Sequence, residues 1–272
     1  MPHLRSVALK GIPAGEPARF PFSVPVIRSL GTLELGDAVT LLVGENGSGK
    51  STLLEGIAAA AGLPTVGSES MDRDETLAAQ RRLGRALTLV WNRRTRRGFF
   101  LRAEDFFGFA KALSKLRAEM LGRLEELDVE YETRSEYAKG LAQLPLRNSI
   151  AEMERRYGVN LDENSHGQSF LKLFQSRFVP GGLYLLDEPE APLSPQSQLA
   201  LIALIADMVR QDAQFIIATH SPILLGFPDA AIYSCDRAPI ERVAFEDLDH
   251  VVVTRDFLND RERYLRHLEG DR

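Results

Sequence analysis

The sequence predicts an α/β fold with a mostly parallel core sheet, an N-terminal antiparallel β part and a helical insertion. Three observations support this fold class. A continuous apolar run at residues 38–43 has the composition of a strand buried on both faces. Two more apolar runs, 182–186 and 214–218, flank a helical pattern at 196–210, and this alternation is typical of parallel sheets. Between the two halves, residues 103–163 have a mainly helical pattern.

The composition is that of an ordinary globular chain. Of 272 residues, 44% are hydrophobic and 26% charged, which excludes a collagen-like, fully disordered or disulfide-rich protein. The single cysteine, Cys235, cannot form an internal disulfide bond, and there is neither a signal-peptide core nor an apolar run long enough to span a bilayer. We therefore expect a cytoplasmic protein. The net charge of −5 argues mildly against a surface that binds nucleic acid throughout.

The N-terminal part is expected to consist of short strands separated by turns, with one helix after the buried strand. Gly31 and residues 36–37 mark turns. Alanine and leucine dominate residues 51–61, which favours a helix that ends at Gly62. Strands are predicted at residues 24–30, 33–35, 38–43, 86–91 and 99–101, with a loop over 64–82 and a turn through 92–98 between the last two strands.

An amphipathic helical pattern follows, and Pro145 is expected to break it. The chain is therefore divided into a core, residues 1–102 and 164–272, and a helical insertion lobe, residues 103–163. The apolar stripe of the lobe, expected to pack locally, consists of Leu113, Leu116, Met120, Leu124 and Leu127. The second half of the core is predicted to contain helices 168–178, 196–210 and 256–268, strands 182–186, 214–218 and 231–235, and a hairpin around Pro239.

Residues 44–51, GENGSGKS, match the pattern G-x-x-x-x-G-K-[ST] at every fixed position. A buried strand precedes them and a helix follows, which is the structural context of a phosphate-binding P-loop. The glycines let backbone N–H groups point at phosphate oxygens, Lys50 can reach the β- and γ-phosphates, and Ser51 can bind Mg²⁺. A glycine-rich turn without a ligand is the less favoured alternative. The predicted nucleotide-binding residues here are Gly44, Glu45, Asn46, Gly47, Ser48, Gly49, Lys50, Ser51 and Thr52.

Polar residues end the two later strands. Asp187 follows the run LYLL and can hold Mg²⁺ beside Ser51, while Glu188 can act as general base for an attacking water. Taken alone, such a pair is also common in structural turns, so its value depends on the P-loop. His220 ends the strand in FIIATHSP and can hydrogen-bond a γ-phosphate, although a structural histidine is the stronger interpretation of this residue by itself. The other histidines show no metal-ligand spacing.

A further anion site is predicted where the segment NSHGQ opens a helix. Ser165 is a natural N-cap, and Gly167 lets the backbone approach a ligand closely. Gln168 is the first residue of the expected helix.

The segments GENGSGKS, NSHGQS, LYLLDEPE and ATHSP, in this order, resemble the nucleotide-binding domain of the ABC-type ATPase superfamily. NSHGQ is similar to that family's LSGGQ signature, with His166 in place of a glycine. The segment DEPEAPLSP resembles the corresponding segment of the soluble RecF/SMC-like branch and of small stand-alone AAA-family ABC-type ATPases more than that of transporter subunits.

The resemblance implies an ATP- and Mg²⁺-dependent ATPase that works as a homodimer with ATP sandwiched between two subunits. Lys50, Glu188 and His220 would then be the catalytic residues, with Ser51 and Asp187 at the metal. Ser165, Gly167 and Gln168 of the partner subunit would complete the site, and residues 193–195 would cross the interface. Such a protein would act as a soluble molecular switch.

Two features of the family have no clear counterpart in this sequence. The glutamine that normally follows the strand at 99–101 is absent, and Glu104 is the candidate for its place. The aromatic side chain that stacks on adenine is also undetermined. Phe20 and Phe22 are its candidates, although core packing is the stronger interpretation of each.

Seven arginines and no acidic residue occur within residues 81–97. One interpretation is a solvated face, or salt bridges to the acidic segment at 125–132. The other is contact with the phosphate backbone of DNA, because guanidinium groups bind phosphate oxygens bidentately. Both interpretations are kept. The four candidate nucleic-acid contacts in the turn are Arg93, Arg94, Arg96 and Arg97.

Other functions remain as alternatives to the switch. The first is an energy-coupling ATPase subunit of a membrane transporter, which the missing glutamine disfavours. A P-loop kinase would need neither the signature-like helix nor Glu188 beside Asp187. A regulator that binds ATP without appreciable turnover would differ from the switch only in its rate of ATP hydrolysis.

Overall fold

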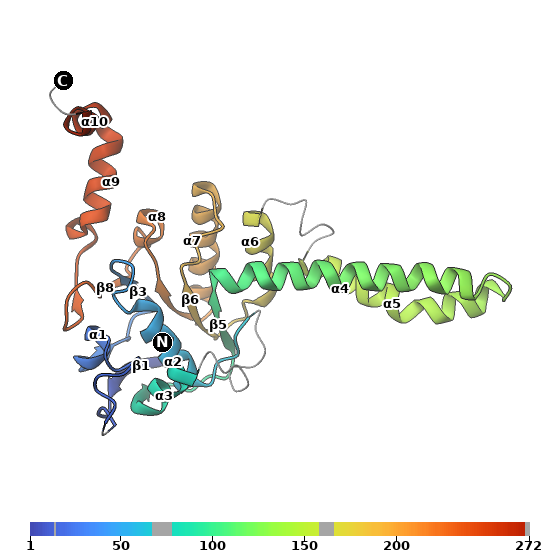
Figure 1. Ribbon diagram of the computed structural model, residues 1–272, viewed down its shortest axis with the longest axis horizontal. Helices are drawn as coiled ribbons and strands as arrows, with labels where there is room; N and C mark the ends of the chain where they lie inside the picture. Colours follow the sequence, from blue (N-terminus) through green and yellow to red (C-terminus); the bar gives the residue numbers. More distant parts are fainter. Residues whose placement is uncertain (14, 67–77, 158–165, 270–272) are drawn as a thin grey trace.

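Two sheets form the centre of the molecule (Figure 1). The computed structural model describes residues 1–13, 15–66, 78–157 and 166–269. A three-stranded antiparallel sheet has the order β2-β1-β4, and a six-stranded sheet has the order β5-β6-β7-β3-β8-β9. In the second sheet, all strands pair in parallel except β9, which is antiparallel to β8. The predicted fold class is confirmed.

The strands, in chain order, are β1 Leu4–Leu9, β2 Thr32–Glu34, β3 Val39–Val43, β4 Leu87–Trp91, β5 Gly98–Arg102, β6 Leu183–Asp187, β7 Gln214–Ala218, β8 Ala231–Ser234 and β9 Glu241–Arg242. The helices are α1 Pro25–Arg28, α2 Lys50–Ala61, α3 Ala78–Ala86, α4 Ala103–Glu130, α5 Glu136–Tyr157, α6 His166–Arg177, α7 Pro195–Arg210, α8 Pro222–Leu225, α9 Asp249–Asn259 and α10 Arg261–Glu269, with a short 3₁₀ helix, η2 Phe245–Asp247.

The two faces of the six-stranded sheet bury their side chains in two different hydrophobic clusters. In β3, Val39, Leu41 and Val43 belong to the cluster that includes residues of α6 and α7. Leu42 belongs to the other cluster, together with residues of α1 and α2. A parallel strand that is covered on both faces has no polar side, which explains the continuous apolar runs in the sequence. The strands are thus fixed rigidly, and so are the polar residues at their ends.

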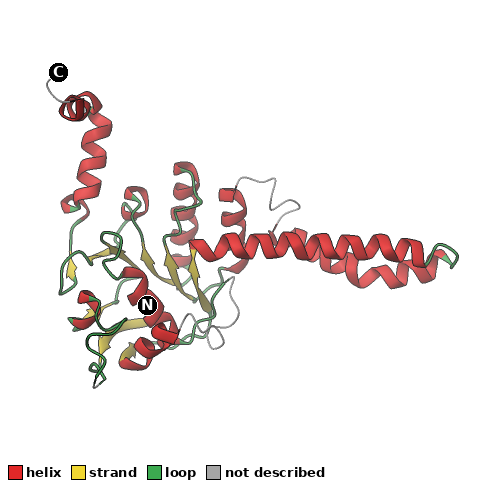
Figure 2. Cartoon of the chain, in the orientation of Figure 1, coloured by secondary structure: helices red, strands yellow, loops and turns green. Residues whose placement is uncertain are grey.

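Helices α4 and α5 lie side by side and extend far from the sheets (Figure 2). Arg117 of α4 forms a 2.7 Å ion pair with Glu154 of α5, and Lys139 of α5 forms a 2.8 Å ion pair with Asp128 of α4. Part of the predicted apolar stripe lies between the helices, because Leu127 is buried, whereas Leu116 is 42% exposed. None of the described helices combines the length and the apolarity needed to cross a membrane.

The N-terminal part differs from the sequence prediction in two elements. Residues 24–30 are not a strand, because Pro25 starts the short helix α1, for which its fixed φ is suited. The expected loop at 64–82 overlaps α3, which begins at Ala78. The predicted strands on either side of residues 92–97 do form, and they belong to different sheets: β4 pairs with β1, and β5 pairs with β6.

The helical segments also differ from the prediction at two points. Pro145 does not end its helix: α5 runs through it. A proline removes only one backbone donor, and the ion pairs to α4 hold the two sides of α5 in place. The single helix expected at 256–268 is two helices, α9 and α10, separated at Asp260, whose φ of −146° is not helical.

Candidate nucleotide-binding site

The P-loop, residues 44–51, connects β3 to α2 as predicted. Gly49 has a φ of 103°, and a Cβ atom there would lie 2.6 Å from Cγ1 of Val24, so only glycine fits. Gly47 also has a positive φ, of 84°, which turns the loop back on itself. α2 then starts at Lys50, and its first-turn N–H groups have no partner within the helix. This geometry forms a cradle for an anion.

The side chain of Lys50, the first residue of α2, reaches back to the beginning of the P-loop. Its Nζ donates hydrogen bonds to the carbonyl oxygens of Gly44 (2.6 Å) and Glu45 (3.0 Å). Burial lowers the pKa of Lys50, while the nearby carboxylates of Glu188 and Asp187 act in the opposite direction. A buried ammonium group in this position is available to bind phosphate oxygens in the cradle.

Ser51 and Asp187 meet, although they lie 136 residues apart in the sequence. Ser51 Oγ donates a 3.1 Å hydrogen bond to Asp187 Oδ1. Burial raises the pKa of Asp187 from its ordinary value of 3.8 to about 7, and the bond from Ser51 opposes this shift. A hydroxyl and a carboxylate are ligands that suit Mg²⁺, which needs only one or two protein groups besides phosphate and water. The described residues contain no cluster of three His, Cys, Asp or Glu that could hold a metal ion.

Glu188 and His220 face each other beside Asp187. His220 Nε2 lies 3.5 Å from Glu188 Oε1, without forming a hydrogen bond. The backbone N–H of Glu188 donates to Ala218 O (2.8 Å), which ties the ends of β6 and β7 together. Glu188 has a φ of 49°, uncommon for a residue with a side chain, so the backbone turns sharply where the carboxylate is presented. Burial lowers the pKa of His220, which favours the neutral imidazole.

Glu190, which sequence reasoning missed, fixes the turn that carries His220. Its Oε1 accepts hydrogen bonds from Thr219 Oγ1 (2.7 Å) and from the backbone N–H groups of His220 (2.7 Å) and Ser221 (3.2 Å). Burial raises the pKa of Glu190, and these hydrogen bonds act against the shift. A carboxylate two residues after Glu188 therefore orders the neighbouring strand end.

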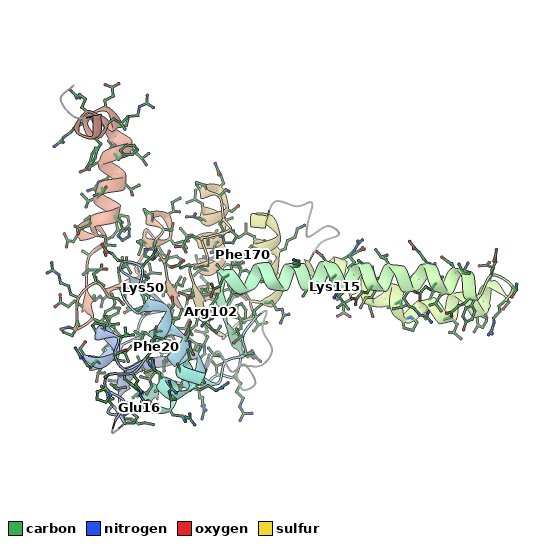
Figure 3. The ribbon with its side chains drawn as sticks, viewed as in Figure 1. Glu16, Phe20, Lys50, Arg102, Lys115 and Phe170 are labelled. Atoms are coloured by element: carbon green, nitrogen blue, oxygen red, sulfur yellow. The ribbon has the colours of Figure 1, made fainter. Side chains whose placement is uncertain are left out.

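A cavity of about 430 Å³ lies on the Ser51 side of this site. Arg102 lines it, as do Asp187 and Glu188. Arg102 is opposite Asp187 in the register of β5 and β6, and it forms an ion pair with Glu55, one helical turn after Ser51. Figure 3 shows Lys50 and Arg102 on the core, whereas Lys115 lies out along α4.

Another cavity, of about 600 Å³, opens over the first half of the P-loop. Asp236, at the end of β8, accepts a 2.6 Å hydrogen bond from the backbone N–H of Glu45. Sequence reasoning missed this residue, although it follows the parallel strand β8 by two positions. His250, from the first turn of α9, lines the same cavity as His220.

Several predicted residues are not part of this cluster. Ser165 lies outside the described residues, and Gly167 lies in the first turn of α6, which packs against α5 and α7. Gln168 is in the same turn. Phe22 is fully buried in the core beside α2, so it has no free face for adenine, whereas Phe20 is 46% exposed. Glu104 lines the cavity at Ser51, but most of its side chain is exposed.

Arg93, Arg94, Arg96 and Arg97 are exposed in the connection between β4 and β5. Arg97 donates a 3.2 Å hydrogen bond to Pro180 O. Within the described ranges, none of the four forms an ion pair with a carboxylate, and the acidic segment pairs instead with Arg123 and Lys139. The structure thus gives no support to salt bridges between these four arginines and residues 125–132.

Two family models match this chain, and both describe an AAA domain. One covers residues 26–82, which include the whole P-loop. The other covers residues 173–226, which include Asp187, Glu188 and His220, and its description also names the AbiEii toxin and a type IV toxin–antitoxin system. The matched residues include both the P-loop and the strand-end residues of the site, so the family models agree with the ATPase superfamily that the four motifs predict.

Solved structures with similar folds include ABC ATPase cassettes and SMC heads. The ADP conformation of MJ1267, an ATP-binding cassette of an ABC transporter, is 16% identical with a TM-score of 0.45, over 100% of both chains. The SMC head domain from Thermotoga maritima is 17% identical with a TM-score of 0.39, over 90% of this chain and 100% of that one. The Smc head of Pyrococcus furiosus bound to the C-terminal domain of ScpA is 12% identical with a TM-score of 0.41, over 96% of this chain and 100% of that one. No curated protein matches this chain.

Proposed function

We propose that this ATPase domain binds ATP with Mg²⁺ at the P-loop and hydrolyses it, and that it acts as a molecular switch. The observation that carries the proposal is the 3.1 Å contact between Ser51 Oγ and Asp187 Oδ1. It joins a P-loop hydroxyl to a carboxylate at the end of β6, directly before a second carboxylate, Glu188. A P-loop that served structure alone would need neither carboxylate.

Each side chain has a role that follows from its position. Lys50 and the P-loop N–H groups bind the phosphates, and Ser51 and Asp187 hold Mg²⁺, which neutralises charge on the phosphate oxygens when bound. Glu188 accepts a proton from the water that attacks the γ-phosphate. His220, kept neutral by burial, donates a hydrogen bond to an oxygen of the γ-phosphate and positions the water together with Glu188.

We further propose that two copies of the chain close on two ATP molecules. The P-loop lies between β3 and α2, whereas the signature-like segment ends at α6, which packs against α5 and α7. Ser165, Gly167 and Gln168 would therefore act on the nucleotide of the partner subunit. On this proposal, ATP binding closes the dimer and hydrolysis opens it.

The test uses Glu188→Gln, which removes the base but keeps the shape of the side chain. We expect this variant to bind ATP, to lose at least about 100-fold in hydrolysis rate, and to elute as a dimer with ATP and Mg²⁺. Glu241→Gln, on the exposed strand β9, is the matched control and should hydrolyse ATP at the wild-type rate. Binding of ATP by Lys50→Ala as tight as wild type would overturn the site, and a monomeric Glu188→Gln protein with ATP bound would overturn the dimer.

The exposed arginines of the β4–β5 connection support a second proposal, that the switch acts on DNA. Arg93, Arg94, Arg96 and Arg97 form a cationic patch on a chain with a net charge of −5. Because guanidinium groups without carboxylate partners are free to bind phosphate, this patch fits a nucleic-acid backbone.

This proposal is tested by ATPase rate and DNA binding across a salt series. Stimulation by duplex or single-stranded DNA should fade as salt rises and should be lost when the four arginines become alanine. Replacement of Arg255, Arg261, Arg263 and Arg266 removes the same charge from exposed positions on α9 and α10 and is the matched control. Equal rates with and without DNA at low salt would overturn the proposal.

A further inference from the structure

The cavity over the P-loop is bordered by residues from the C-terminal segment. We call it the phosphate cavity; its volume is about 600 Å³. One wall is the P-loop itself, and the facing wall comes from the end of β8 and from the first turn of α9. Its side chains outside the P-loop are His220, Asp236, Arg237, Asp249 and His250.

Three buried polar atoms around this cavity have no hydrogen-bond partner among the described residues: Ser48 Oγ, His220 Nε2 and His250 Nε2. A buried polar atom without a partner costs about 1–3 kcal/mol, so such atoms usually mark a missing ligand or water. Because all three residues border one cavity, a single ligand with several oxygen atoms can form hydrogen bonds with the hydroxyl and with both imidazoles.

The charges around the cavity favour a phosphate group as that ligand. Burial lowers the pKa values of both histidines, and the nearby charge of Lys50 acts in the same direction. Arg237 is the cation that lines the cavity itself. Two carboxylates border it as well. Asp236 is held by the backbone N–H of Glu45, and Asp249 lies in the first turn of α9. Asp236 takes the backbone N–H of Glu45, so Arg237 and the N–H groups in the first turn of α2 are the donors left for the ligand.

We propose that His250 contacts the terminal phosphate of the bound nucleotide and thereby fixes the base of α9. The proposal rests on the ATP binding proposed above. α9 contacts η2 and α8, and α10 follows it. Figure 1 shows α9 and α10 extending from the core in a different direction from α4 and α5. A contact at His250 would therefore report the nucleotide state to this helix pair, independently of α4 and α5.

The experiment compares wild type, His250→Ala and His250→Gln for ATP and ADP affinity and for hydrogen exchange in residues 249–259. Wild type should show slower exchange in the first turn of α9 with ATP than with ADP. His250→Ala should lose this difference and should bind ATP about tenfold more weakly with ADP affinity unchanged, the effect of one charge-assisted hydrogen bond. His250→Gln keeps a polar side chain and should retain part of the effect.

Arg255→Ala, one turn along the same helix and exposed, is the matched control and should behave as wild type. Thermal unfolding of each variant separates a local effect from a loss of fold. If wild type binds no nucleotide, the proposed function fails. If wild type and His250→Ala bind ATP equally and α9 exchanges alike with ATP and ADP, the role of His250 is overturned while the proposed function stands.

Discussion

Glu190 Oε1 accepts a 2.7 Å hydrogen bond from the backbone N–H of His220, and the same oxygen also accepts from Thr219 and Ser221. The turn that carries His220 is therefore held by a side chain from the neighbouring strand end. Because Glu190 follows Glu188 by two positions, one short segment after β6 supplies both the carboxylate that faces His220 and the carboxylate that holds its turn. Glu190 lines neither of the two cavities at the P-loop, and its hydrogen bonds go to the turn of His220, so we assign it the role of positioning His220.

Glu190→Ala should lower the ATPase kcat with little change in KM for ATP. The variant leaves Thr219 Oγ1 and the backbone N–H of His220 without this acceptor, which should also reduce the free energy of unfolding by about 1–3 kcal/mol. The Ser221 N–H keeps its 3.0 Å hydrogen bond to Thr219 Oγ1. Glu190→Gln keeps an acceptor oxygen and should recover most of kcat. Steady-state kinetics and urea unfolding give both quantities. A kcat for Glu190→Ala equal to that of wild type would show that His220 needs no such support.

Asp187 should make the nucleotide-free protein less stable as pH rises. Its pKa is about 7 in the folded state, against an ordinary value of 3.8, so the folded state holds an extra proton between these values. The stability contribution of Asp187 therefore falls from about pH 4 to pH 7. Asp187→Asn should become more stable than wild type by up to about 4 kcal/mol at pH 8. Mg²⁺ with ATP should cancel this advantage, because the metal prefers the carboxylate.

The measurement is chemical unfolding of both proteins between pH 4 and 8, with and without Mg²⁺ and ATP. Asp236→Asn serves as a comparison at the end of another parallel strand. An unchanging gap between Asp187→Asn and wild type across this pH range would contradict the raised pKa.

The ion pair between Arg102 and Glu55 should be detectable by a double-mutant cycle. Glu55 is 5% exposed, and burial raises its pKa against the effect of Arg102. Arg102→Met would leave this carboxylate buried without a cation and should cost about 3–5 kcal/mol of unfolding free energy. The double variant with Glu55→Gln should recover much of this loss. Additive effects of the two changes would contradict the coupling.

Two glycines should respond to alanine in opposite directions. Gly98 begins β5 with a φ of 121°, and a Cβ there would overlap the backbone of Leu183 in β6. Gly98→Ala should therefore destabilise the protein by several kcal/mol, because both the conformation and the strand pairing oppose it. Gly140, in α5, has open space around it, and Gly140→Ala should stabilise the protein by about 0.5–1 kcal/mol. Thermal unfolding measures both, and a stable Gly98→Ala protein would contradict the close approach of β5 to β6.

The sequence predicted the central strands well because their local pattern reflects their surroundings. The run at Val39–Val43 is apolar throughout because both of its faces are covered. By contrast, β4 and β5 have similar apolar sequence patterns. Neither pattern indicates that β4 pairs with β1 and β5 with β6. A strand was predicted at residues 24–30, whereas Pro25 starts a helix there.

The site divides in the same way. The P-loop, Asp187 and His220 follow buried strands, and the carboxyl ends of parallel strands meet at one edge, so their proximity could be expected. Asp236 comes shortly after β8, so the same rule could have predicted its position near the P-loop. His250 was not, because it comes to the P-loop only when the chain after β9 folds back. The ion pair between Arg102 and Glu55 could not be predicted, because it depends on the register between β5 and β6 and on the position of α2.

Helix α4 begins at Ala103, the residue directly after Arg102, and runs without interruption to Glu130. Its 28 residues correspond to a length of about 42 Å. At that length, each degree of tilt at its first turn displaces the far end by about 0.7 Å. A rearrangement of a few degrees beside Ser51 and Asp187, too small to disturb the sheet, would therefore become a movement of several ångströms at the tip of the α4–α5 pair.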